Sequence, residues 1–216
     1  MTTDNHLLAR CERIATSTWS DALDELAVEG VVAGISQRSG RGRFAAYAVT
    51  AREVAGPLRT FARKEFAVGD LIASVGPGQA LVVDAGGAPI STFGGLAALA
   101  ASLRGAAAVV IDGGCRDIEE IRATNLWLGS RVVTPTSGKT RIRVESIGEP
   151  VHLGGVLVRT GDLVVGDETG IVIVPRAQIA AVFAKAEAIV EKDRMIEAAL
   201  RAGKSFSEAA AAADYI

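Results

Sequence analysis

The sequence is poor in the residues on which many enzyme classes depend. It holds two cysteines, Cys11 and Cys115, and two histidines, His6 and His152, among 216 residues. So few cysteines imply neither a disulfide framework nor a cysteine-rich zinc site, and isolated histidines offer no paired metal ligands. Aromatic residues make up 5% of the chain, so its core has to be built from Ala, Val, Leu and Ile.

Long apolar runs and blocks of basic residues are also missing. No segment approaches the length of a membrane span, and the first residues lack the basic start and apolar stretch of a secretory signal. With a net charge of −2 and no Lys/Arg cluster, nucleic acid is not expected as a direct ligand. The absence of Walker A, G-x-G-x-x-G and G-x-S-x-G sequences weighs against nucleotide, dinucleotide and serine-hydrolase chemistry. We therefore expect a soluble cytoplasmic protein without membrane partners.

Hydrophobic residues make up 49% of the chain, and their spacing predicts its elements. Helical spacing predicts N-terminal helices at about 5–29, with Ser17 or Ser20 capping the second, and C-terminal helices at about 177–213. Between them, alternating strands and helices predict parallel pairing through right-handed crossovers. The predicted strands are 44–54, 80–85 and 107–111, and the predicted helices are 64–72, 94–103 and 118–124.

The remaining segments are short and rich in glycine. Residues 36–43 are predicted to form a loop, and short apolar runs from 132 to 174 are predicted to be strands. We interpret Asp167 and Glu168 as part of a hairpin turn in which Gly170 has a positive φ; the alternative is that the two acids bind a metal. Together these patterns predict an α/β fold, with a sheet sandwiched by helices in a single domain over 1–216.

The most informative stretch runs from Ala106 to Asp117. Its apolar part predicts a central strand that is covered on both faces. Gly113 and Gly114 are then predicted to turn the chain sharply. Arg116 and Asp117 would follow at the carboxyl end of the strand, where α/β folds usually carry their chemistry. An arginine can grip carboxylate or keto oxygens, and an aspartate can hold a hard cation such as Mg²⁺ or Mn²⁺.

Gly94 and Gly95 open the helix that precedes this strand, and free N–H groups at a helix start bind anions. One interpretation is a carboxylate clamp made from this helix start and Arg116, with Asp117 and Glu120 beside it. The other is that Arg116 and Asp117 pair with surface neighbours and that the glycines only form turns. Short motifs often arise by chance, so the residues alone leave both interpretations open.

Other chemically capable residues also have two interpretations. Cys115 has no histidine nearby in sequence and is interpreted as an apolar core residue rather than a nucleophile. His152 falls in a predicted strand and is interpreted as structural. Asp112 either orients the arginine that follows the strand or caps the turn. Glu187 and Glu191 are interpreted as the solvated face of the long C-terminal helix; the alternative is that one of them reaches the metal of a neighbouring subunit.

A longer pattern joins the central residues. Gly95, twenty further residues and then Arg116-Asp117-Ile118-Glu119-Glu120 match G-x₂₀-R-D-x₂-[ED]. On this motif, and on Ser17–Leu23, Gly155–Asp162 and Asp167–Pro175, the chain resembles the RraA-like family. This family contains 4-hydroxy-4-methyl-2-oxoglutarate aldolases and the regulator of ribonuclease E activity. The resemblance covers most of the chain.

The resemblance implies a layered β/β/α core like that of phosphohistidine swivelling domains. It implies a homotrimer or a hexamer with sites at subunit interfaces. Asp117 would hold Mg²⁺ or Mn²⁺ partly through waters, Glu120 would orient those waters, and Arg116 would bind the keto or carboxylate oxygens of pyruvate. The residues whose amides would surround the pyruvate carboxylate are Gly94, Gly95, Leu96 and Ala97.

By this likeness we expect a class II aldolase that cleaves 4-hydroxy-2-oxo acids, such as 4-hydroxy-4-methyl-2-oxoglutarate, to pyruvate. Oxaloacetate decarboxylation would be a side activity, because it passes through the same enolate. The alternatives are a non-catalytic regulator of a ribonuclease and a dedicated oxo-acid decarboxylase. The family's regulators typically lack the aspartate that this chain keeps as Asp117, which favours the enzyme. The family's aldolases often carry an acid where this chain has Gly95, a difference that bears on the substrate.

Overall fold

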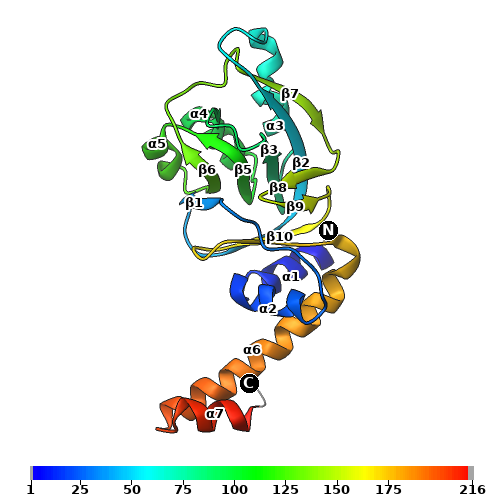
Figure 1. Cartoon of the computed structure of the whole chain (residues 1–216), viewed down its shortest axis with the longest axis vertical. Helices are drawn as coiled ribbons and strands as arrows, with labels where there is room; N and C mark the ends of the chain where they lie inside the picture. The colour runs from blue at the N-terminus through cyan, green and yellow to red at the C-terminus, as the bar shows by residue number, and fades with distance from the viewer. Residues whose placement is uncertain (1, 214–216) are drawn as a thin grey trace.

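The computed structural model describes residues 2–213 and centres on one nine-stranded sheet (Figure 1). The strands of this sheet are β1 (Ser36–Ser39), β2 (Phe44–Ala55), β3 (Gln79–Asp84), β4 (Ser91–Phe93), β5 (Ala108–Cys115), β6 (Trp127–Val133), β7 (Ile142–Ile147), β10 (Leu163–Gly166) and β11 (Ile171–Val174). A separate hairpin is formed by β8 (Val151–Leu153) and β9 (Val156–Val158). The helices are α1 (Thr2–Cys11), α2 (Thr16–Asp24), α3 (Val68–Ala73), α4 (Gly95–Leu103), α5 (Ile118–Ala123), α6 (Ile179–Arg201) and α7 (Phe206–Ala212), with 3₁₀ turns η1 (Arg63–Phe66) and η2 (Arg176–Gln178).

The centre of the sheet is parallel and its margins are antiparallel. The main path is β1-β6-β5-β3-β2-β10-β11, and β2, β3, β5 and β6 run parallel to one another. The short strand β4 also pairs parallel with β5, which sets Phe93 opposite Cys115. Because β4 and β5 end side by side, the residues that follow each of them leave the sheet at the same edge.

Two apolar layers cover the two faces of this sheet. On one face α3, α4 and α5 contribute Leu71, Ala98 and Ile121 to a buried cluster with β3 and β5. On the other face the β8–β9 hairpin packs Val151 and Leu153 against the sheet. The resulting β/β/α layering confirms the predicted fold class.

The terminal helices form a third core with the β10–β11 hairpin. Trp19 of α2 stacks near Phe183 of α6, with 6.0 Å between the ring centroids, and Val165 and Val172 belong to the same cluster. Beyond α2, α6 extends away from the sheet, and α7 folds back along its far end (Figure 1). Within the residues described, no helix is long and apolar enough to cross a membrane.

The predicted serine cap of the second helix is wrong. Helix α2 begins at Thr16, its N-cap is Ala15, and Ser17 lies inside the helix, as does Ser20. The acceptor that a cap would supply comes instead from a distant turn, because the carboxylate of Asp167 accepts hydrogen bonds from the backbone N–H and the hydroxyl of Thr16. The helical region also ends at Asp24, earlier than the predicted limit near residue 29.

The predicted turn at Gly113 and Gly114 is also wrong, because β5 continues through both to Cys115. A Cβ on Gly113 would lie 2.8 Å from the Cβ of Ala85, and one on Gly114 would lie 2.7 Å from the carbonyl oxygen of Ile90. The two glycines therefore let the strand pack closely against the loop that precedes β4. They do not reverse the chain.

Three smaller predictions also need correction. Residues 36–43 do not form a loop throughout, since β1 pairs antiparallel with β6. The predicted helix 64–72 is divided into η1 and α3 at Ala67, where φ is 37°. The turn between β10 and β11 forms as predicted, with the Asp167 N–H bonded to the Gly170 carbonyl at 3.0 Å, but Gly170 is not among the residues with positive φ. Strand β4 was not predicted.

Candidate active site

Arg116 and Asp117 form the link between β5 and α5. The backbone N–H of Arg116 donates to the carbonyl of Phe93 at 2.9 Å, which ties the link to the end of β4. Asp117 is the N-cap of α5 and has left-handed backbone angles, φ 54° and ψ 52°. Residues other than glycine rarely adopt this conformation, and it recurs at functional sites. It is this residue, rather than the preceding glycines, that redirects the chain.

The carboxylate of Asp117 reaches the start of α4. Its Oδ2 accepts a hydrogen bond from the Gly95 N–H at 3.3 Å and lies 3.6 Å from Nε of Arg116. The side chains of Arg116 and Asp117 are 36% and 42% exposed, so both groups remain open to a ligand. One carboxylate thus joins the beginnings of two helices beside a guanidinium.

Two glycines make this approach possible. A Cβ on Gly94 would overlap Oδ2 of Asp117 and would lie 3.3 Å from Nε of Arg116. A Cβ on Gly95 would lie 2.5 Å from the Cβ of Glu120. Any larger residue at either position would push these side chains away. The sequence motif therefore corresponds to one cluster in space.

A cavity of about 250 Å³ opens at this cluster. Its lining residues are Phe66, Val68, Ser91, Thr92, Gly94, Leu96, Ala97, Arg116, Asp117, Ser137 and Lys139. Lys139 and Thr92 were not anticipated, because they come from a loop and from the unpredicted strand β4. Glu120 is exposed on α5 and lies outside this lining.

The carboxylates of the site are too few for a metal centre made of protein ligands alone. Among residues 2–213, no group of three or more His, Cys, Asp or Glu side chains is placed to hold a metal ion. A cation beside Asp117 would therefore be completed by water and substrate oxygens. Mg²⁺ is commonly bound in this way, by one or two carboxylates and several waters.

Cys115 and Asp112 have structural roles next to the site. Cys115 is buried, and burial raises the pKa of its thiol while its Sγ lies 3.3 Å from the hydroxyl oxygen of Ser130. Asp112 neither orients Arg116 nor caps a turn after the strand. Its carboxylate accepts from Nε of Arg131 at 2.5 Å and from the Gly154 N–H at 2.9 Å, which fastens the β8–β9 hairpin to the sheet.

The other candidates from the sequence lie outside the cavity. Asp167 accepts hydrogen bonds from the N–H groups of Thr169 and Gly170 in its own turn, as the hairpin interpretation requires. On α6, Glu187 pairs with Arg10 at 2.5 Å, and Glu191 pairs with Arg194 at 3.4 Å. His152 is exposed on β8.

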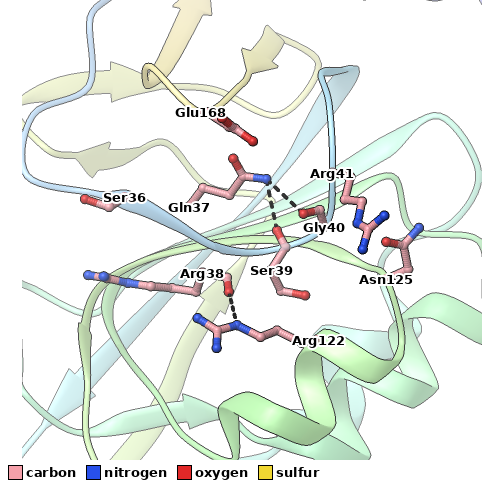
Figure 2. A pocket seen from close by; sticks show the side chains of 9 residues that line it. All are labelled: Ser36, Gln37, Arg38, Ser39, Gly40, Arg41, Arg122, Asn125 and Glu168. Atoms are coloured by element: carbon pink, nitrogen blue, oxygen red, sulfur yellow. Dashed lines mark hydrogen bonds between the residues drawn. The ribbon is translucent and has the colours of Figure 1, made fainter.

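A second hollow, of about 470 Å³, lies along β1 and was not anticipated. Figure 2 shows its basic and amide side chains, several of which bind neighbouring backbone. Nε of Arg122 donates to the Arg38 carbonyl at 3.1 Å, and Nε2 of Gln37 donates to the carbonyls of Ser39 and Gly40. These contacts hold the edge strand and the loop that follows it.

Curated proteins from several organisms are similar to this chain. The chain is 33% identical over 127 residues to an uncharacterized protein of Methanocaldococcus jannaschii, a match that covers 59% of this chain and 61% of that protein. It is 34% identical over 155 residues to a protein of Halalkalibacterium halodurans whose name proposes a 4-hydroxy-4-methyl-2-oxoglutarate aldolase. That match covers 68% of this chain and 72% of the relative.

Solved structures with the same fold cover more of the chain. An uncharacterized protein of Pseudomonas syringae has a TM-score of 0.85 and 29% identity, and the match covers 95% of this chain and 92% of that one. Streptomyces coelicolor RraAS2, described as an unusual member of the RNase ES inhibitor RraA protein family, has a TM-score of 0.78 and 26% identity, with 88% and 97% covered. The family model described as "RraA-like: Aldolase/RraA" matches residues 16–173. The chain therefore belongs to the RraA-like family.

Proposed function

We propose that this protein is a divalent-metal-dependent aldolase that cleaves 4-hydroxy-2-oxo acids, such as 4-hydroxy-4-methyl-2-oxoglutarate, and releases pyruvate. The observation that carries the proposal is the meeting of Asp117, Arg116 and the start of α4 around one cavity. A carboxylate for a cation, a guanidinium for oxygen and free amides for an anion are the groups that bind a 2-oxo acid. The name of the Halalkalibacterium relative supports the same reaction.

The residues present fit a hydrated cation. Asp117 offers a carboxylate that is 42% exposed on the wall of the cavity of about 250 Å³, which leaves space for an ion with its waters. Asp117 would hold Mg²⁺ or Mn²⁺, and Glu120 would orient the waters around it. When bound, the ion would withdraw electron density from the 2-keto oxygen of the substrate.

The protein's own groups would bind the substrate and stabilise the developing charge. The Gly95 N–H is engaged by Asp117. The first amides of a helix have no partner within it, so those of Leu96 and Ala97 would receive the substrate carboxylate. As the bond between C3 and C4 breaks, negative charge gathers on the keto oxygen, where Arg116 would stabilise it. Lys139 would neutralise a second carboxylate at the far end of the substrate.

We also propose that the protein is an oligomer that forms through α4. Leu96, Leu99 and Leu103 form an apolar stripe on one face of α4 and are 85%, 45% and 79% exposed. Exposed stripes of this kind mark interaction surfaces, and this one begins at the cavity. We propose that it is covered by a second copy of the chain in a trimer or a hexamer of single-domain subunits, which would place the site at a subunit interface.

One alternative is a non-catalytic regulator of a ribonuclease, which the description of RraAS2 favours. A second is a dedicated oxo-acid decarboxylase that uses the same enolate. Only an activity test against several oxo acids separates these three functions. The regulator predicts no turnover and a stable complex with a ribonuclease.

The test is pyruvate release measured through lactate dehydrogenase. We expect turnover of 4-hydroxy-4-methyl-2-oxoglutarate and slower turnover of oxaloacetate in the presence of Mg²⁺ or Mn²⁺. EDTA should abolish both, and added metal should restore them. Faster turnover of oxaloacetate would instead assign a decarboxylase, and no turnover of any oxo acid with metal present would contradict enzymatic function.

A further inference from the structure

Glu53 is a buried carboxyl group behind the candidate site. It lies in the apolar strand β2, and only 5% of the residue is exposed. Its Oε2 accepts a hydrogen bond from the hydroxyl of Thr92 at 2.5 Å, whereas its Oε1 has no partner among the residues described. A buried carboxylate with a single hydrogen bond is unfavourable, so the structure favours a group that takes up a proton readily.

Within residues 2–213, no cation forms an ion pair with this carboxyl group. Arg52, the residue before Glu53 in β2, pairs with Asp84, and Arg143 of the neighbouring strand β7 pairs with Glu145. In η1, which packs against β7, Glu65 binds the backbone of its own turn. Burial therefore dominates and raises the pKa of Glu53 to about 7, against the lowering effect of the hydrogen bond from Thr92. The charged residues of the cavity lining are Arg116, Asp117 and Lys139, and none of them forms an ion pair with Glu53.

Thr92 connects this carboxyl group to the cavity. Thr92 is one of the cavity-lining residues, lies two positions before Gly94 and is 2% exposed. A hydroxyl can donate one hydrogen bond and accept another at the same time. Thr92 therefore links Glu53 to the wall of the cavity, because its hydroxyl bonds Glu53 and the residue itself lines the cavity beside Arg116 and Asp117.

We infer that Thr92 and Glu53 form a proton relay for the reaction in this cavity, in which Thr92 meets the substrate and Glu53, a positioning residue behind it, stores the proton. The inference rests on the proposed function, because it assigns the base and the acid of that reaction. The chain's two histidines do not line the cavity, and the relay assigns the proton transfer to a hydroxyl and a carboxyl group instead.

Protons and electrons balance over one turnover of this relay. In cleavage the C4 hydroxyl gives its proton to Oγ1 of Thr92 while the proton of Thr92 passes to the Glu53 carboxylate. The C4–O bond becomes a carbonyl, the bond between C3 and C4 breaks, and its electron pair forms the pyruvate enolate. The proton then returns from Glu53 through Thr92 to C3, which yields pyruvate and restores the carboxylate. No further reactant is required.

Exchange of the pyruvate methyl protons with D₂O, followed by ¹H NMR with Mg²⁺ present, isolates the proton transfer from bond cleavage. For the wild type we expect exchange that accelerates with pH as Glu53 ionises, around the value of about 7. Glu53→Gln should lower the rate by about 100-fold and abolish this pH dependence. Thr92→Val should do the same, whereas Thr92→Ser should retain exchange, and Glu149→Gln, an exposed change outside the cavity, should have no effect.

Three outcomes would overturn the relay while leaving the proposed function intact. The first is that Glu53→Gln exchanges the pyruvate methyl protons at the wild-type rate, whereas Asp117→Ala does not exchange them. The second is a Glu53→Gln rate that is lowered equally at every pH, which would mean a structural role. The third is a Glu53 carboxyl carbon that titrates at the ordinary glutamate value in ¹³C NMR of the ligand-free protein. A wild type that neither exchanges pyruvate nor cleaves oxo acids would contradict both the relay and the proposed function.

Discussion

At the scale of single residues, the candidate site depends on the absence of a side chain at Gly94. This glycine lets Oδ2 of Asp117 approach the start of α4, and a left-handed backbone at Asp117 aims the carboxylate in that direction. The geometry is therefore sensitive to changes of one carbon atom. Together with the close approach of Glu120 to Gly95, it explains why α4 has glycine both at its N-cap, Gly94, and at its first residue, Gly95.

Gly94→Ala should displace the carboxylate of Asp117 without unfolding the chain. We expect kcat for pyruvate release to fall by at least about 10-fold, because misplacement by roughly 1 Å costs positional catalysis heavily. The matched control is Gly69→Ala in α3, where an added Cβ would meet nothing within 4 Å. Steady-state kinetics should show full activity for the control, and full activity for Gly94→Ala would contradict the proposed role of the cluster.

The sequence predicted part of this site and missed the rest for a physical reason. Arg116 and Asp117 follow an apolar strand directly, so their place at its carboxyl end is a local property of the chain. The bond between Glu53 and Thr92 depends on how β2 and β4 are arranged, and β4 is too short to be recognised from its pattern. The one local signal was Glu53 itself, an acid in the mostly apolar sequence of β2.

At the scale of elements, Asp167 joins the β10–β11 hairpin to α2. Burial alone would raise the pKa of this carboxyl group, but hydrogen bonds from the Thr16 hydroxyl and from the backbone of Thr16, Thr169 and Gly170 outweigh it and lower the pKa below the ordinary value. A carboxylate whose pKa is lowered on folding stabilises the protein above its unfolded-state pKa. This stability is lost as the pH falls through the folded-state pKa.

Asp167→Ala should lower the free energy of unfolding by about 2 kcal/mol at neutral pH, because three backbone donors and a hydroxyl lose their acceptor. Urea unfolding should show this difference from the wild type narrowing below about pH 4. Glu168→Ala, an exposed change in the same turn, should have little effect. If the free energies of unfolding of the variant and the wild type differ by the same amount down to about pH 3, the ionised carboxylate does not have the assigned role.

Element prediction succeeded where hydrophobic periodicity was strong and failed where packing decided the outcome. The short strands from 142 to 174 were recognised from apolar runs between glycines. Strand β1 was missed because its sequence, Ser-Gln-Arg-Ser, has no apolar pattern and is extended only through its pairing with β6. Gly113 and Gly114 were misassigned because a glycine needed for close packing looks the same in sequence as one needed for a turn.

At the scale of the whole molecule, the apolar face of α4 adjoins the cavity and is covered by no other described element. Replacing Leu96 and Leu103 together by Glu should split the proposed oligomer, because charged side chains would be buried at the contact. Light scattering coupled to size-exclusion chromatography should give a smaller particle than the wild type. Leu58→Glu, a change at another exposed leucine, is the control.

If the subunit contact completes the site, the dissociated variant should also lose pyruvate release. A wild type that is monomeric at assay concentrations would contradict the interface. A variant with both leucines replaced that forms a particle of the same size as the wild type would also contradict the interface.

The central claim is that Asp117 and Arg116 together bind the cation and the 2-oxo acid. Its most direct test is metal-dependent pyruvate release from 4-hydroxy-4-methyl-2-oxoglutarate by Asp117→Ala and Arg116→Ala, each confirmed as folded by circular dichroism. We predict that Asp117→Ala has no metal-dependent turnover, and that Arg116→Ala loses at least about 100-fold in kcat/KM, with kcat lowered and KM raised. Wild-type rates in either variant would contradict the account.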